Sequence, residues 1–295
     1  MHNEYYNFAI ARAQKLSSSI PLKEYQEVMP LTATYFNTKE HLKFSQIQDF
    51  KLLPITKGEK WGDAWDSAWF FMQADVSNNK IPSELLANID VNGEAIVFTP
   101  AGIPHQGLTN GSIFKVSTGR SLFTIPAHWI KKGKIEFWVE ASASSLFGIK
   151  REDDPAENCP QPHGNYQGIY NEGILIVKNH FLSEFRRDLN YIIALLIELA
   201  PLSVQRARCL KALDDSVNLY YQSNGENQDC ILPLKKVLNY KANESSINLY
   251  AIGHAHIDTG WLWPVKETIR KCGRTFSSQL RLMEVYPDYK FGASQ

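Results

Sequence analysis

The sequence has little cysteine, no surplus of charge of either sign and no long apolar run. Its 295 residues contain four cysteines, and none of them forms a C-x-x-C pair. This argues against a disulfide framework and favours reduced thiols in the cytosol. Lys plus Arg and Asp plus Glu both total 31, so the net charge is zero. The basic field that nucleic-acid and membrane-surface binding favour is therefore missing.

The given residues also lead us to expect neither a targeting signal nor a membrane-spanning segment. The N-terminus, "MHNEYYNFAIARAQKL", lacks the basic region and apolar core of a secretory signal. The longest apolar run, "YIIALLIELAPL", includes Glu198 and is shorter than the roughly 20 residues that a membrane helix needs. These absences predict a cytoplasmic protein that binds neither nucleic acid nor membrane. With 44% hydrophobic and 21% charged residues, the composition is typical of a globular protein.

The residue composition and the spacing of apolar residues change several times along the chain, and these changes predict its domains. Residues 1–60 mix short helical signals with loops, as in an N-terminal extension. Residues 61–149 carry strand-like runs without intervening helices, which predicts an antiparallel β sandwich or jelly roll. Polar, proline-rich and glycine-rich residues predict a loop or linker at 150–180. Apolar residues at three-to-four spacing then predict a helical segment over 181–246.

Two local signals refine this division. The Asn92-Gly93 pair inside "ANIDVNGEAIVFTP" predicts a hairpin between two strands. In the helical segment, Pro201 ends one helix and Ser203 is suited to cap the next.

The last residues, 247–295, predict a strand, a long helix and a second strand. "INLYAIG" is short and nearly all apolar, as in a buried parallel strand. "VKETIRKCGRTFSSQLRLMEVY" follows Pro264 and is amphipathic, and "YKFGAS" suits a second strand. The fold class is therefore α+β with several domains, ending in a βαβ unit. Without neighbouring strands, this unit is expected to expose apolar faces and unpaired edges.

The stretch "GHAHIDTGWLWP" lies where the first of these strands ends. His254, His256 and Asp258 alternate along the chain, so they share one side if the strand geometry persists. Sites on parallel α/β folds lie at the carboxyl ends of strands. Imidazole and carboxylate groups are good zinc ligands, and a catalytic zinc site takes about three protein ligands. The motif predicts part of a metal site; a hydrogen-bonded histidine pair, with Asp258 capping a helix, is the structural alternative.

Two metal-dependent families use similar residues with a poorer fit. Amidohydrolases place H-x-H after the first strand of a barrel, usually near the start of the domain, and "GWLWP" has no counterpart there. Metallo-β-lactamase-like hydrolases place a histidine directly after the aspartate, where this chain has Thr259.

The longer string from residue 250 to residue 295 closely resembles the start of the catalytic domain of α-mannosidases of glycoside hydrolase family 38. The resemblance includes the core "HIDTGWLWP", the helix start "ETIRK" and the ending "LRLMEVYPDY". Upstream, "WGDAWDSAWF", "QGLT", "IPAHW" and "SLFG" occur in an order similar to that in the cytosolic and bacterial branch of the family.

This resemblance implies the first βαβ unit of a catalytic α/β barrel, truncated here. It also implies retaining hydrolysis of terminal α-linked mannose with a divalent metal, most often zinc. His256 and Asp258 match two metal ligands, and Trp261 matches an aromatic residue that packs against the bound sugar. His254 matches a neighbour of the ligands, and Trp263 has no catalytic counterpart and is expected in the core.

The resemblance places the nucleophile, the acid/base carboxylate and the other ligands beyond Gln295, so no catalytic carboxylate is assigned here. The chain alone is then expected to be inactive, because retaining hydrolysis needs two carboxyl groups. The expected partner is a mannose-containing oligosaccharide, and self-association stays open. A non-catalytic carbohydrate-binding or assembly module and an amidohydrolase-type hydrolase are the alternatives. The β module resembles a galactose-binding jelly roll, in which "QGLT" and Trp129 have either a ligand-binding or a structural role.

Overall fold

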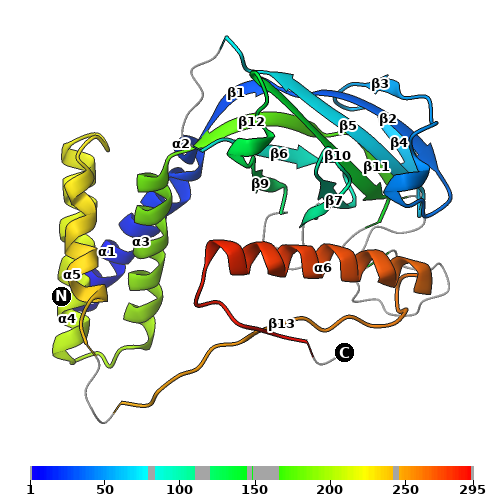
Figure 1. Ribbon diagram of the computed structural model, residues 1–295. Helices are drawn as coiled ribbons and strands as arrows, with labels where there is room; N and C mark the ends of the chain where they lie inside the picture. Colours follow the sequence, from blue (N-terminus) through cyan, green and yellow to red (C-terminus); the bar gives the residue numbers. More distant parts are fainter. Residues whose placement is uncertain are drawn as a thin grey trace. The chain divides into compact units, whose positions relative to one another are not determined.

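The chain forms two compact units in the computed structural model, which describes residues 2–78, 84–109, 120–144, 148, 166–241 and 246–293. One unit combines residues 1–26 with 177–249, and the other combines 27–176 with 250–295 (Figure 1). Each unit is thus assembled from two separate stretches of the chain. Within the described residues, no helix is both long and apolar enough to cross a membrane.

The first unit is helical. Its elements are α1 (His2–Ser19), α2 (Pro21–Glu24), α3 (His180–Glu198), α4 (Val204–Gln222), the 3₁₀ turn η3 (Gln228–Ile231) and α5 (Leu232–Leu238). The predicted break and cap between α3 and α4 are confirmed, because the Ser203 hydroxyl accepts a hydrogen bond from the Arg206 N–H at 3.1 Å. Asn179 caps α3 in the same way through the Leu182 N–H.

Helix α1 joins this unit although it lies far from α3 and α4 in the sequence. Ala9, Ala13 and Leu16 follow one face of α1 at helical spacing and are buried in the same core as the apolar faces of α3 and α4. Arg12 forms an ion pair with Asp214 of α4 at 3.0 Å. The expected N-terminal extension is therefore divided, since its helix packs with the helical segment and its strands enter the β-sheets.

The second unit is built around two β-sheets. A four-stranded sheet has the order β1-β12-β6-β9, and a six-stranded sheet has the order β3-β2-β5-β10-β7-β8. A further pair joins β4 to β11. The strands are β1 (Tyr25–Pro30), β2 (Thr32–Thr38), β3 (Leu53–Ile55), β4 (Lys60–Asp63), β5 (Ser67–Asp75), β6 (Leu86–Asp90), β7 (Glu94–Phe98), β8 (Pro104–Leu108), β9 (Leu122–Thr124), β10 (Lys134–Ser142), β11 (Gln167–Ile169) and β12 (Glu172–Lys178); short 3₁₀ turns lie at Phe44–Gln46 and Ala127–Trp129.

Aromatic side chains fill the space between these strands. Phe123 of β9 contacts Phe137 of β10 edge to face, with ring centroids 5.2 Å apart, which joins the two sheets. Trp61 and Phe70 are 1% and 0% exposed and also meet edge to face. The predicted antiparallel β module is therefore present, and β12 lies inside the stretch expected to be a loop or linker, most of which is outside the described residues.

The hairpin predicted at Asn92-Gly93 is wrong. Strand β6, before the turn, pairs with β9 and β12, whereas β7, after it, pairs with β8 and β10 in the other sheet. Asn92 does adopt the left-handed conformation that such turns need, with φ of 47°. The local signal therefore identified a change of chain direction, but partners distant in sequence decided which strands pair.

The C-terminal stretch contains β13 (Gly253–His254), α6 (Val265–Val285) and β14 (Phe291–Gly292). Gly253 lies opposite Phe291 in a parallel register, so the predicted βαβ unit is present. The first strand is shorter than predicted, because Ile247, Leu249 and Tyr250 precede it and are 95%, 90% and 87% exposed.

Helix α6 does not lack a partner, and in this respect the expected exposure of the βαβ unit is wrong. The helix packs on β8 and β7 of the six-stranded sheet (Figure 1). Glu267, Lys271 and Arg274 on this face of α6 are 0%, 7% and 5% exposed. The expected exposure of apolar side chains is found on the other face of the helix, where Ile269 is 75% exposed.

Candidate functional site

The predicted site residues lie on the loop that joins β13 to α6. His256 Nε2 lies 3.1 Å from Asp258 Oδ1, and the two side chains are 61% and 44% exposed. The structure therefore brings this histidine and carboxylate together on an open surface. His254 is exposed as well and lies in β13, where it is opposite Gly292 of β14.

The hydroxyl of Thr268, in the first turn of α6, holds this loop in place. It accepts hydrogen bonds from the Gly260 N–H at 3.1 Å and from the Trp263 Nε1–H at 3.2 Å. It also lies 3.4 Å from the Asp258 carbonyl oxygen, to which it donates. This one hydroxyl thus binds two backbone groups of the loop and the Trp263 indole, and it joins the backbone of Asp258 to the helix.

The two tryptophans of the motif have different environments. Trp261 is 53% exposed, whereas Trp263 is 9% exposed. The rings meet edge to face, with centroids 5.4 Å apart. The Lys271 ammonium lies 4.4 Å from the centre of the Trp263 ring, a cation–π contact. Trp263 is therefore a core residue, as expected, and Trp261 is the ring that solvent reaches.

His256 and Asp258 suit part of a metal site. Two donors bound at about 2.1 Å to one tetrahedral ion lie roughly 3.4 Å apart, close to the separation of these two atoms. A stable site needs further ligands, and the described part of the chain contains no group of three or more His, Cys, Asp or Glu side chains that could hold an ion. The donor chemistry of these two side chains fits part of a divalent-metal site.

A buried group of charges holds α6 on the sheet below the loop. Glu94 of β7 and Glu140 of β10 are both 4% exposed and face basic residues of the helix. Glu140 pairs with Arg270, and Glu94 lies 3.9 Å from Arg274. Arg274 also binds Glu267 at 2.6 Å within the helix. Burial raises the pKa of Glu267, but the Arg274 and Arg270 charges outweigh it and lower this pKa overall.

Two glycines of the β module lie against the C-terminal stretch. A Cβ at Gly107, in "QGLT", would be 2.8 Å from the Arg274 carbonyl oxygen, and a Cβ at Gly148, in "SLFG", would be 2.0 Å from that of Leu262. The Gly107 N–H also donates to Ser278 Oγ of α6 at 3.0 Å. Of the two roles considered for "QGLT", the structure shows the structural one. The same holds for Trp129, which is 5% exposed and packs on Phe137.

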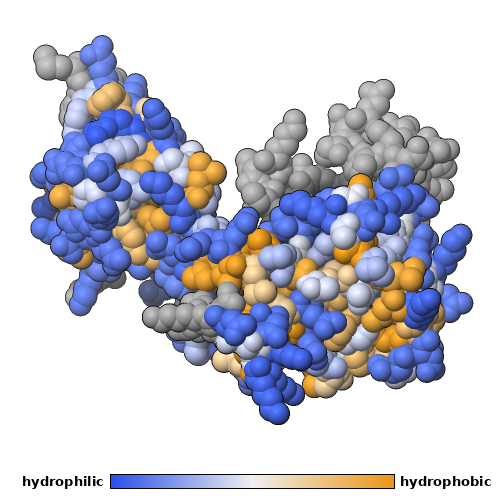
Figure 2. Space-filling model, turned by 90° about the horizontal axis from the view of Figure 1, so that it is seen from above, coloured by the Kyte–Doolittle hydropathy of each residue, from blue (hydrophilic) through white to orange (hydrophobic). Residues whose placement is uncertain are grey.

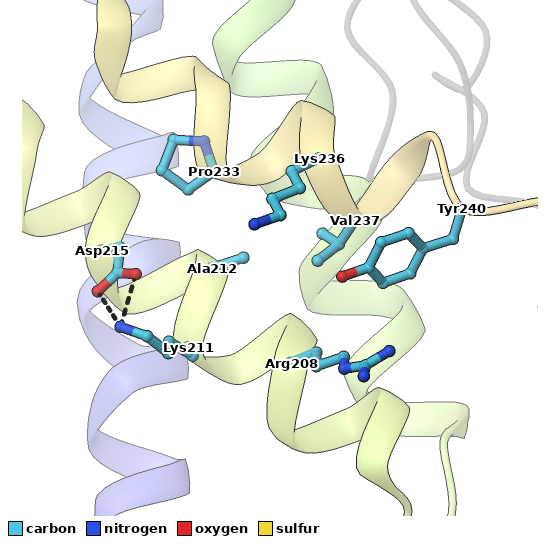
Figure 3. A pocket seen from close by; sticks show the side chains of 8 residues that line it. All are labelled: Arg208, Lys211, Ala212, Asp215, Pro233, Lys236, Val237 and Tyr240. Carbon is cyan, nitrogen blue, oxygen red and sulfur yellow. Dashed lines mark hydrogen bonds and ion pairs between the residues drawn. The ribbon is translucent and has the colours of Figure 1, made fainter.

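A hollow in the helical unit is separate from these residues. Figure 3 shows it between α4 and α5, lined by Arg208, Lys211, Ala212, Asp215, Pro233, Lys236, Val237 and Tyr240. Lys211 is bound to Asp215 at 2.8 Å inside it. None of the residues predicted from the sequence lines this hollow. Elsewhere on the surface, polar and apolar side chains are intermixed over the face shown in Figure 2.

Sequence reasoning missed Thr268 and the buried charges of α6. The only available signal was the spacing of Glu267, Lys271 and Arg274 along one face of the helix. In isolation, such a charged stripe is typical of a solvent-exposed face, so its burial could not be predicted without the glutamates of the sheet.

Two family descriptions match this chain. "Alpha-mannosidase, jelly roll domain" matches residues 28–167, which cover most of the β module. "Glycosyl hydrolases family 38 N-terminal domain" matches residues 246–295, which include the loop and α6. The first match covers a little under half of the chain and the second about a sixth of it, and both descriptions name glycoside hydrolases.

Similar proteins carry related names. "Alpha-mannosidase 2C1" of Mus musculus is 26% identical over 90% of this chain and 25% of its own length. "Alpha-mannosidase" of Saccharomyces cerevisiae is 28% identical over 80% of this chain and 22% of its own. The chain spans about a quarter of the length of these curated relatives.

Among solved structures, "Faecalibacterium prausnitzii Beta-glucuronidase" shows a TM-score of 0.35 at 11% identity, covering 53% of this chain and 31% of its own, which is too low to inform the fold. The family matches and the α-mannosidase relatives agree with each other over both the β module and the C-terminal stretch. The chain therefore resembles the N-terminal portion of the α-mannosidases of glycoside hydrolase family 38.

Proposed function

We propose that this chain is the N-terminal portion of a cytoplasmic, metal-dependent α-mannosidase that hydrolyses terminal α-linked mannose from oligosaccharides with retention. One observation carries the proposal: His256 Nε2 and Asp258 Oδ1 lie 3.1 Å apart and exposed on a loop whose sequence matches family 38. The chain would supply two metal ligands and part of the sugar site, and the catalytic carboxylates would come from the remainder of the enzyme.

In this proposal, His256 and Asp258 hold a divalent cation, most often zinc. When bound, the cation supplies Lewis-acid stabilisation and a contact to hydroxyls of the mannose. The exposed indole face of Trp261 packs against the C–H face of the sugar ring and orients it. Trp263 and Thr268 touch no substrate, and they keep the loop in one conformation through the hydrogen bonds of the Thr268 hydroxyl.

The test is a pair of substitutions in the full-length enzyme. We expect His256→Ala and Asp258→Asn each to abolish both stoichiometric metal and turnover of an α-mannoside, because each removes a donor. Metal content is measured by atomic emission on the purified proteins. Stoichiometric metal in Asp258→Asn would show that Asp258 is not a ligand.

Trp261→Ala is the matched variant, since it changes the same loop without removing a donor. It should retain the metal and raise KM for the α-mannoside. A variant that unfolds, with unchanged activity in the folded fraction, would instead make Trp261 a packing residue.

A further inference from the structure

The turn between β4 and β5 contains a tryptophan in a conformation that suits glycine. The Asp66 N–H donates to the Asp63 carbonyl oxygen at 2.8 Å, which closes a four-residue turn around Ala64 and Trp65. Trp65 has φ of 68°, whereas Ala64 is not among the residues with positive φ. This is the pattern of a type II turn, in which the third residue is usually glycine or asparagine. A bulky residue there is strained, so its side chain needs another reason to be present.

The core does not supply that reason. Trp61 and Trp69, on either side of the turn, are each 1% exposed and make aromatic contacts in the core. Trp65 is partly exposed, and across the described stretches it makes no ring contact. Its backbone N–H donates to the Ala143 carbonyl oxygen at 3.0 Å, a bond that any residue except proline could make. The turn therefore holds a partly exposed indole outside the aromatic contacts of the core.

The side chain of Trp65 lines a hollow of about 280 Å³. The other walls come from the same turn, from the end of β2 and from the start of α6: Lys39, Asp63, Ala64, Asp66 and Lys266. The size is just below the range typical of small-molecule sites, roughly 300–1,000 Å³, which suits a single ring.

The chemistry of this lining favours a neutral, hydroxyl-rich ligand. The lining has two ammonium groups, which can donate hydrogen bonds, and two carboxylates, which can accept them, so an ion of either sign meets repulsion as well as attraction. Asp63 is also paired with Lys60, and Asp66 Oδ2 accepts a hydrogen bond from the Asp63 N–H at 2.9 Å. Sugar hydroxyls both donate and accept, and the C–H face of a pyranose packs on an aromatic ring. An indole beside mixed donors and acceptors is therefore suited to a sugar.

We propose that the Trp65 hollow is a carbohydrate-binding subsite that takes one pyranose residue of a glycan. It uses none of the residues of the His256–Asp258 loop. The inference goes beyond the proposed function, because binding there requires neither a metal nor a catalytic carboxylate.

The experiment measures binding of methyl α-D-mannopyranoside to the 295-residue chain in EDTA, by titration with saturation-transfer NMR. EDTA removes metal-dependent binding at the loop. Wild-type chain should bind, and Trp65→Gly should bind at least about tenfold more weakly, because truncated tryptophans are among the costliest losses at binding sites. Trp65→Phe, which retains a ring, should lose less, and Lys39→Met should weaken binding severalfold while leaving the turn intact.

Thermal unfolding separates this role from a structural one. Glycine fits φ of 68°, and this relief of strain offsets the loss of the partly buried indole, so the unfolding temperature of Trp65→Gly should stay close to that of the wild type. No binding by wild-type chain, or undiminished binding by Trp65→Gly, would overturn the proposal. So would loss of binding together with a lower unfolding temperature in both Trp65→Gly and Trp65→Phe. Loss in Trp261→Ala with full retention in Trp65→Gly would assign the sugar to the loop instead, which overturns this subsite and leaves the proposed function standing.

Discussion

At the scale of single residues, Thr268 holds the loop of the candidate site in place through one hydroxyl group. Its hydroxyl meets Gly260, Trp263 and the backbone of Asp258 at 3.1, 3.2 and 3.4 Å. Gly260, with φ of 83°, lets the loop turn back toward the helix. The position of the Asp258 carboxylate therefore depends on a residue ten positions later in the chain.

We expect Thr268→Val in the full-length enzyme to weaken metal binding by roughly 10–100-fold, the usual cost of losing a group that orients a ligand. Valine keeps the shape and removes the hydroxyl. Thr268→Ser retains the hydroxyl and should restore metal affinity, measured by competition with a fluorescent chelator. Equal affinities for the valine and serine variants would show that the hydroxyl does not position Asp258.

His105, in β8, is a second residue whose environment matters. Its Nε2 is buried without a hydrogen-bond partner among the described residues. Burial lowers its pKa to about 4; the Arg281 and His128 charges act in the same direction, and Glu284 acts against them. His105 is therefore neutral in the folded state where an unfolded chain already binds a proton.

The unfolded state thus takes up this proton between the ordinary histidine pKa of about 6.5 and the folded value, so the free energy of unfolding falls as pH decreases across this range. His105→Gln should flatten that decrease in urea titrations at several pH values. His180→Gln, at an exposed position, is the control. Part of the slope should persist, because the pKa of His41 is also lowered to about 4, chiefly by burial. Parallel curves for wild type and His105→Gln would contradict this role.

At the scale of elements, α6 depends on charges that the sheet presents to it. Glu136 and Glu140 alternate with apolar residues along β10, so the sequence pattern predicts the same solvent-facing role for both. The structure separates them: Glu136 is exposed, and Glu140 is buried against Arg270. A buried pair is costly to break because the remaining charge loses its partner.

We therefore expect Glu140→Gln to lower the free energy of unfolding by roughly 3–5 kcal/mol. Glu136→Gln, four residues earlier on the same strand, should change the free energy of unfolding by less than about 0.5 kcal/mol. Urea denaturation of the 295-residue chain measures both. Similar values for the two variants would mean that the Glu140–Arg270 pair does not hold the helix.

At the scale of the whole molecule, the C-terminal stretch is divided between a covered helix and the exposed residues that precede β13. Helix α6 is covered by β7 and β8 on one face. The residues before it, Ile247 to Ile252, lie outside the regular elements and are 66–95% exposed where their side chains are large and apolar. Covering one face of the helix therefore leaves the residues before β13 exposed.

Hydrogen exchange on the 295-residue chain should reflect this division. Amides in the middle of α6 should exchange slowly, like those of β10, and amides of residues 247–252 should exchange rapidly. The same preparation should not hydrolyse an α-mannoside, since the proposed function places the catalytic carboxylates outside it. Fast exchange throughout α6 would contradict its docking, and robust turnover would contradict the division of catalytic residues.

The sequence by itself determined the local features of this protein. The capping role of Ser203, the length of α6 and the closeness of His256 to Asp258 all follow from patterns within a few residues, because helical periodicity, capping and short loops are local. The resemblance of the motif to family 38 is likewise contained in one continuous string. The α-mannosidase family matches agree with that resemblance.

Only the tertiary structure decided the pairings between distant segments. It placed α1 with α3 and α4, sent β6 and β7 into different sheets, and buried Glu140 under α6. The physical reason is that burial and strand pairing depend on surfaces contributed by both partners. A charged stripe or an Asn-Gly turn has the same sequence whether its neighbour is water or another strand.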